Sequence, residues 1–129
     1  MTALELKSPR DGSVLRFQLV KRYEEEVEFE VSVQTPWFTG RAPCSTFMNG
    51  SPSAMFRSMA NEWQGWKGSK SWKDLEDRVS LSGTSDSTGH VSLAIDLVGQ
   101  DYETKLRVVL EYEAGQLEAM ASSVAGLLG

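Results

Sequence analysis

The chain has 129 residues, of which 40% are hydrophobic and 24% charged, and its formal net charge at pH 7 is −5. These values are typical of one globular domain and exclude wholesale disorder, so we expect a single domain over residues 1–129. The negative charge argues against non-specific binding to nucleic acids or anionic membranes, and it permits a basic protein partner.

The sequence indicates a reducing compartment. Cys44 is the one cysteine, so the chain can form neither an internal disulfide nor a multi-cysteine zinc site. The N-terminal residues lack the apolar core of a secretory signal, and no apolar run approaches the ~20 residues that cross a bilayer. We therefore expect a soluble, cytoplasmic protein with no membrane partner.

The first half of the chain predicts four strands, at about residues 3–7, 15–19 and 27–33 and then in a segment that ends near Phe47. Apolar and polar residues alternate in the first three, which is the period-2 pattern of a half-buried strand. The third pattern is the clearest, because valines and Phe29 occupy one face while Glu28 and Glu30 occupy the other. Pro36 then interrupts the strand ladder.

A helix is predicted next, at about residues 52–65. Ser51 can cap its first turn and Pro52 suits the first helical position, while the glycine at position 65 suits its end. Apolar residues recur at steps of three and four, which gives one buried stripe. The stripe consists of Met55, Phe56, Met59, Trp63 and Trp66.

Three further strands, around residues 75–81, 91–97 and 106–112, precede a final amphipathic helix that begins near Gly115. The short links between strands favour antiparallel pairing, since parallel neighbours need long crossovers. Each helix must bury its apolar stripe, most simply against one sheet. The fold class expected is therefore α+β, in the order β-β-β-β-α-β-β-β-α, with one antiparallel sheet of about six to seven strands and both helices packed on one of its faces.

Catalytic and cofactor signatures are missing from the sequence. A cysteine nucleophile needs a base within reach, so Cys44 and His90 form a conceivable pair, but structural roles are the more common fate of such residues. The aspartates do not follow a calcium-loop spacing, and neither a Gly-rich phosphate motif nor a nucleophile elbow occurs. We therefore expect a protein that is not an enzyme and that uses no cofactor and no metal.

An acidic row in the third strand is the first surface feature of interest. Glu26, Glu28 and Glu30 are expected to project from one strand face at intervals of about 7 Å. The ordinary interpretation is a solvated face or a guarded edge, because charged side chains discourage edge-to-edge pairing. The functional interpretation is a docking surface for a basic protein, with Trp37 as a further contact.

The second surface feature of interest is the segment Trp63–Lys73, which holds three tryptophans and three lysines. Aromatic and basic side chains together can stack on bases, but the acidic chain makes nucleic-acid binding the weaker interpretation. Tryptophans more often anchor a helix end on a sheet. An alternative function follows from this segment: a small-molecule pocket between sheet and helices, lined by Phe56, Trp63 and Trp66.

The order of several short motifs resembles the WapI-like immunity-protein group and related small bacterial domains of unknown function. The motifs that carry the resemblance are Pro36–Gly40, Ala54–Phe56, Trp63–Gly65, Gly89–Val91 and Gln116–Glu118. The resemblance extends from about Val27 to Leu128 and transfers no catalytic residue. It implies a bacterial protein that neutralises a co-produced toxin by binding it. The leading hypothesis is thus a non-enzymatic protein-interaction domain, with an immunity protein as its specific form.

Overall fold

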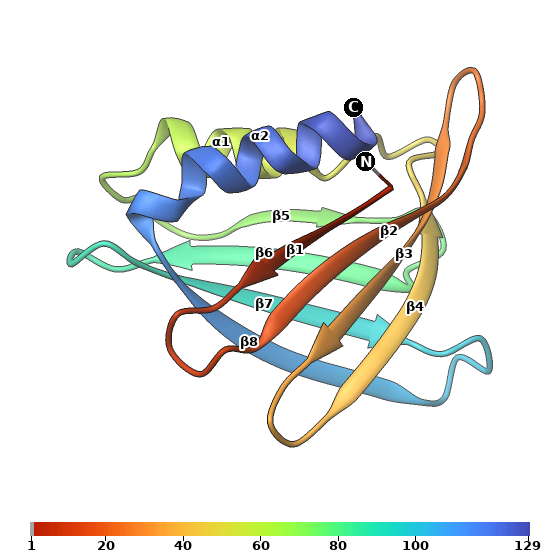
Figure 1. Cartoon of the computed structure of the whole chain (residues 1–129), viewed down its shortest axis with the longest axis horizontal. Helices are drawn as coiled ribbons and strands as arrows, with labels where there is room; N and C mark the ends of the chain where they lie inside the picture. Colours follow the sequence, from red (N-terminus) through yellow and green to blue (C-terminus); the bar gives the residue numbers. More distant parts are fainter. Residues whose placement is uncertain (1) are drawn as a thin grey trace.

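The computed structural model describes residues 2–129, which form two four-stranded antiparallel sheets and two α-helices (Figure 1). The first sheet, sheet A, contains β1 (Ala3–Lys7), β2 (Val14–Arg22), β3 (Val27–Gln34) and β4 (Thr39–Ser45) in that order. The second, sheet B, contains β5 (Lys70–Lys73), β6 (Val79–Ser85), β7 (His90–Val98) and β8 (Lys105–Glu113). Helix α1 (Ser53–Asn61) connects the sheets, and a 3-10 turn, η1 (Ala114–Gln116), leads into α2 (Leu117–Leu128).

The expectation of one sheet of six to seven strands is wrong. One of the eight strands, β5, is only four residues long, too short to show a period-2 pattern, and it lies between the helix predicted at 52–65 and the strand predicted at 75–81. The pairing error has a different cause. Hairpin links fix pairing only between consecutive strands, and α1 separates β4 from β5, which are not paired with each other. The element order is therefore four strands, a helix, four strands and a helix.

From their apolar stripes, both helices were expected to cover one face of a single sheet, and this expectation is wrong. They pack on each other, with α2 against β1 and α1 against β5, so that they cover the side where the first strand of each sheet lies (Figure 1). At the other side of sheet A, β4 approaches β6 and β7 directly. The core lies between these layers, where the ring of Phe17 meets those of Phe29 and Phe56 edge-on, with centroids 5.9 and 6.2 Å apart.

Helix α1 is shorter than predicted and ends at Asn61. The backbone N–H of Glu62 still bonds to the carbonyl oxygens of Ser58 and Met59, but Gly65 has a φ of +124°, which ends any helical path. Trp63 and Trp66 therefore leave the apolar stripe.

Strand β2 contains an irregularity that shapes the surface beside β3. Leu19 pairs with Phe29 and Lys21 pairs with Glu28, so Val20 is an extra residue with no partner on β3. Such a bulge re-aims the side chain of the extra residue. Val20 is 62% exposed as a result.

Candidate functional site

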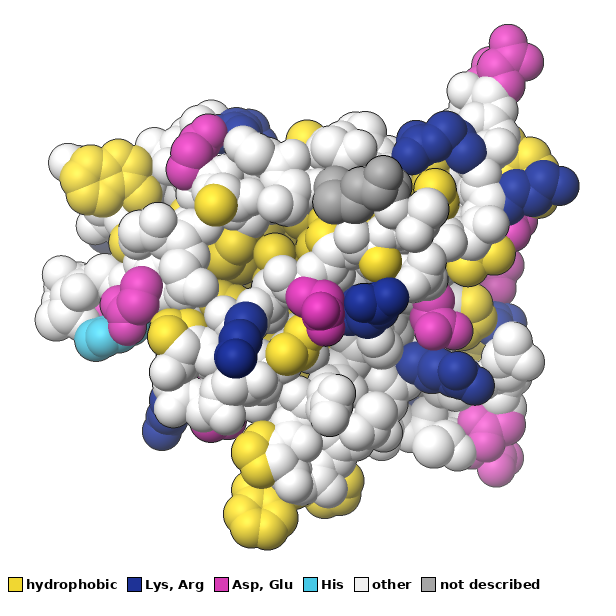
Figure 2. Space-filling view, viewed as in Figure 1, with side chains coloured by type: hydrophobic (Ala, Val, Ile, Leu, Met, Phe, Trp, Pro, Cys, Tyr) yellow, Lys and Arg dark blue, Asp and Glu magenta, His cyan; other side chains and the backbone are white. Residues whose placement is uncertain are grey.

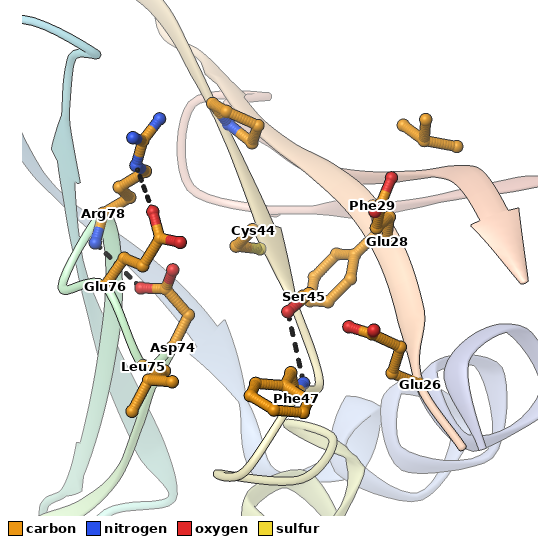
Figure 3. A pocket seen from close by; sticks show the side chains of 12 residues that line it. Glu26, Glu28, Phe29, Cys44, Ser45, Phe47, Asp74, Leu75, Glu76 and Arg78 are labelled. Atoms are coloured by element: carbon orange, nitrogen blue, oxygen red, sulfur yellow. Dashed lines mark hydrogen bonds and ion pairs between the residues drawn. The ribbon is translucent and has the colours of Figure 1, made fainter. Parts of the chain in front are cut away.

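A groove of about 390 Å³ extends from the surface of β3 across β4 to the turn that joins β5 to β6 (Figure 3). Its lining combines acidic, apolar and small polar side chains from both sheets. The lining residues are Val20, Glu26, Glu28, Phe29, Pro43, Cys44, Ser45, Phe47, Asp74, Leu75, Glu76 and Arg78.

Two members of the predicted acidic row line this groove. Glu26 and Glu28 are half-buried, and neither forms an ion pair within residues 2–129. Lys21 lies opposite Glu28 in the strand register, yet its ammonium group lies 4.9 Å from the ring centre of Tyr23. The carboxylates of Glu26 and Glu28 are therefore available to an external cation.

Glu30, the third member of the row, lies one step further along β3. It is half-buried and pairs in register with Gln18 and Pro43, but it is not among the groove-lining residues. The structure thus brings Glu26 and Glu28 into one groove and leaves Glu30 beside it.

The opposite wall is a turn fixed by the buried carboxylate of Asp74. Its Oδ1 accepts the backbone N–H groups of Arg78 at 2.8 Å and Val79 at 3.0 Å. Asp77 adopts a left-handed conformation with a φ of +58°, which aspartate tolerates better than most residues. This fixed turn presents Glu76 to the groove.

Arg78 is the only basic residue among those that line the groove, and it is already engaged. Its Nε lies 3.1 Å from a carboxylate oxygen of Glu76, and its guanidinium group stacks 5.1 Å from the ring centre of Tyr102. Hydrogen bonding to the Tyr102 hydroxyl raises the pKa of Arg78. The groove therefore remains acidic overall.

Exposed apolar side chains occupy the same groove. Val20 is 62% exposed, and Phe47 and Leu75 are each 50% exposed. Large apolar side chains that are exposed together, beside polar groups, are typical of interaction surfaces. The groove is thus both acidic and apolar.

Cys44 and His90 do not form a nucleophile–base pair. Cys44 is buried near Asp74, and burial, with a smaller contribution from the Asp74 charge, raises the pKa of its thiol. His90 is the first residue of β7, beside the end of β6 that is remote from the Asp74 turn, roughly 20 Å from that turn by strand rise. Its Nδ1 is 2.9 Å from the Thr88 hydroxyl oxygen. Two carboxylates, those of Asp86 and Glu113, lie 3.4 Å from its ring nitrogens.

Trp37 lies far from the groove. It is 85% exposed in the turn between β3 and β4, next to Phe38, which is 63% exposed. Hydrophobic side chains protrude at this turn, at the bottom of Figure 2. Glu26 precedes the other end of β3, about 25 Å away by strand rise. Trp37 therefore cannot contact the same small segment of a partner as Glu26.

The residues of the alternative pocket are separated. Phe56 is fully buried in the core, whereas Trp63 is 57% exposed. Trp66 is half-buried, donates its indole N–H to the carbonyl oxygen of Gly83 at 3.2 Å, and lines a shallow depression with residues 64–67 and 85–87. The three side chains do not share a cavity.

Residues 2–129 contain neither a candidate metal site nor a candidate membrane-spanning helix. Within that range, no group of three or more His, Cys, Asp or Glu residues is placed to hold a metal ion. No helix in the same range is long and apolar enough to cross a membrane.

The second wall of the groove was not predicted from the sequence. The pattern at residues 75–81 predicted a strand, which would place Glu76 and Arg78 on a sheet face, whereas β6 begins at Val79. The acidic cluster Asp74–Asp77 was the available signal for a turn, since aspartate is common there. Pro43 was a second signal, because a proline inside a strand indicates a sheet edge.

The chain belongs to a family of unknown function, DUF6228, whose model matches residues 6–129. No curated protein and no solved structure matched the chain. The family match does not extend to the WapI-like immunity proteins that the short motifs resemble.

Proposed function

We propose that this DUF6228 protein is a non-enzymatic protein-interaction domain whose groove beside β4 receives a basic segment of a partner protein. The observation that carries the proposal is the joint presence, in one groove, of three half-exposed apolar side chains and two carboxylates that form no ion pair with any residue from 2 to 129. The carboxylates are those of Glu26 and Glu28, and the apolar residues are Val20, Phe47 and Leu75.

Charge and apolar area have different roles in such an interface. Unpaired carboxylates attract a basic partner and accelerate association, most strongly at low ionic strength. Buried apolar contacts mainly slow dissociation. The groove offers both, and the net charge of −5 extends the attraction beyond it.

Neutralisation of a co-produced toxin is the specific form of this proposal that the resemblance to WapI-like proteins implies. An acidic protein that blocks a basic nuclease would use the groove in this way. The small-molecule alternative has no comparable support, because Phe56, Trp63 and Trp66 do not share a cavity.

The proposal is tested with a charge reversal in the groove, Glu26→Lys with Glu28→Lys. The variant and the wild-type protein are used as bait in lysate of the cell that produces the protein. We expect wild type to retain a basic protein and the variant to lose it. The matched control is Glu24→Lys with Glu25→Lys, which changes the net charge equally at two exposed turn positions outside the groove.

The association and dissociation rates of the complex with the captured protein then distinguish direct contact in the groove from general electrostatic attraction. The groove variant should show faster dissociation, whereas the control should only slow association at low salt. Equal losses in both variants would mean that the groove makes no specific contact. If the captured protein is toxic, co-expression with wild type and not with the groove variant should restore growth.

A further inference from the structure

The outer edge of β4 is unpaired. In an antiparallel ladder, residues alternate between those whose N–H and C=O groups face the partner strand and those whose groups face away. Thr46 donates its N–H to the carbonyl oxygen of Val27, and Thr35 donates to that of Phe38, which fixes the alternation at both ends of the β3–β4 pair. The main-chain groups of residues 39, 41, 43 and 45 therefore face away from β3.

These groups have no partner within residues 2–129. Among the residues that the structure describes, none accepts a hydrogen bond from the backbone N–H of Thr39, Arg41 or Ser45. Pro43 lacks an N–H, and its position is one that an edge strand tolerates because its nitrogen faces away from the ladder. The edge keeps three donors and four carbonyl acceptors.

Sheet B approaches β4 without forming a ladder with it. The other three sheet edges, at β1, β5 and β8, are at least partly covered. Helix α2 packs against β1, and α1 packs against β5. On β8, the backbone carbonyl oxygen of Glu111 accepts a hydrogen bond from the Ser8 hydroxyl at 2.6 Å, and the N–H of Glu113 bonds to the Gln116 side chain. Of the four edge strands, β4 is the one that borders the acidic and apolar groove (Figure 3).

We infer that the partner segment binds in an extended conformation and adds to β4 as a fifth strand of sheet A. This inference rests on the proposed function and specifies its binding mode. Main-chain hydrogen bonds to Arg41 and Ser45 provide affinity, and the side chains around the strand provide selectivity.

The chemistry of the groove defines the sequence of that segment. Successive side chains of a strand point to opposite sides. Since carboxylates and apolar side chains both line the groove, a segment in which basic and apolar residues alternate satisfies both. A second copy of this chain fits poorly, because its β4 would bring a second Glu26 and Glu28 toward the first pair.

The test uses a capped heptapeptide in which lysine and valine alternate, together with two Nα-methylated versions. One version is methylated on the valine amides and the other on the lysine amides, so both keep the charge and the side chains of the parent. Only one set of amides can face β4. We expect one methylated peptide to bind like the parent and the other to lose affinity about tenfold or more.

Amide hydrogen exchange of the protein gives a second readout. Saturation with the parent peptide should slow exchange at Arg41 and Ser45 but not at the exposed Thr88 in the β6–β7 turn. On the protein side, Ser45→Pro removes the edge donor, while Ser45→Ala keeps it as the matched control. Ser45→Pro should bind the parent about tenfold more weakly than Ser45→Ala. If Ser45→Pro does not fold, the two methylated peptides still decide the question.

The outcomes separate this inference from the proposed function. If both methylated peptides bind like the parent, and the Glu26→Lys, Glu28→Lys variant binds none of them, strand addition is overturned while the acidic groove stands. If the parent peptide binds the wild type and that variant equally, or binds neither, the inference fails and the proposed role of the groove loses its support.

Discussion

The phenolic hydroxyl of Tyr112 donates a hydrogen bond of 2.7 Å to the backbone carbonyl oxygen of Leu6. Tyr112 is on β8 and Leu6 is on β1, so this bond joins sheet B to sheet A between strands at opposite ends of the chain. Both side chains are buried, and burial raises the pKa of the Tyr112 hydroxyl. The contact thus stabilises the relative position of the two sheets.

Replacing Tyr112 with phenylalanine should lower the free energy of unfolding by about 1–2 kcal/mol, because the Leu6 carbonyl then loses its partner in a buried place. Urea denaturation monitored by tryptophan fluorescence measures this value. Tyr23→Phe is the matched control, since Tyr23 is 40% exposed and should change stability by about 0.5 kcal/mol or less. Equal effects of the two substitutions would contradict a stabilising role for the Tyr112 hydroxyl.

Gly83 on β6 faces two methionine side chains of α1. A Cβ atom at this position would lie 2.6 Å from the sulfur of Met59 and 3.5 Å from the terminal carbon of Met55. Gly83→Ala should therefore overpack the core and cost about 1–3 kcal/mol of stability. Thermal denaturation followed by circular dichroism measures the loss.

Gly115 provides the control for this substitution. A Cβ at Gly115 meets no atom within 4 Å, so Gly115→Ala should be neutral or slightly stabilising. Truncating the obstructing side chain gives a second check. In the double variant Gly83→Ala with Met59→Ala, the total loss should be smaller than the sum of the single losses by about 1 kcal/mol. Strict additivity would place the strain of Gly83→Ala elsewhere.

The individual strands were largely predictable from the sequence. In β3, buried Val27, Phe29 and Val31 alternate with half-buried Glu28 and Glu30, as the period of two requires. The same pattern located β2, β7 and β8. Alternation fixes which face of a strand is buried, so it also placed the acidic row on the outer face of a sheet.

The arrangement of those strands was not predictable in the same way. Buried Trp72 on β5 packs against Phe29 on β3, with ring centroids 6.0 Å apart, although 43 positions separate the two residues. No local period encodes such a contact between sheets. The groove depends on it, because the turn at Asp74 follows β5 directly and is positioned by sheet B, while Glu26 and Glu28 belong to sheet A.

The β6–β7 turn contains a carboxylate with a strongly lowered pKa. Asp86 accepts hydrogen bonds from the Thr88 hydroxyl and from the backbone N–H groups of Thr88 and His90, at 2.8 to 3.0 Å. These bonds favour the ionised form and lower the pKa of Asp86 from 3.8 to about 2. Because the folded-state pKa is below the ordinary value, the stabilisation is present above about pH 4 and is lost as the pH falls toward 2.

An NMR titration of the Asp86 carboxyl carbon tests this expectation. Thr88→Val removes the hydroxyl that contributes most, so it should raise the pKa of Asp86 toward 3.8. Thr84→Val changes an exposed threonine on β6 and should leave that pKa unchanged. A wild-type Asp86 that titrates near 3.8, or an equal response to both variants, would contradict the role assigned to Thr88.

The thiol of Cys44 should be inert in the folded protein. Thiolate is the reactive form, and burial beside Asp74 raises the pKa of this thiol. At pH 8, alkylation by iodoacetamide should be on the order of a hundredfold slower in native protein than in concentrated urea. Ser87→Cys in a Cys44→Ala background puts a thiol on an exposed turn and should react at nearly the same rate in both conditions. Rapid alkylation of native Cys44 would contradict its burial and would make a nucleophilic role for this groove residue worth testing, since the proposed binding function requires no reactive group there.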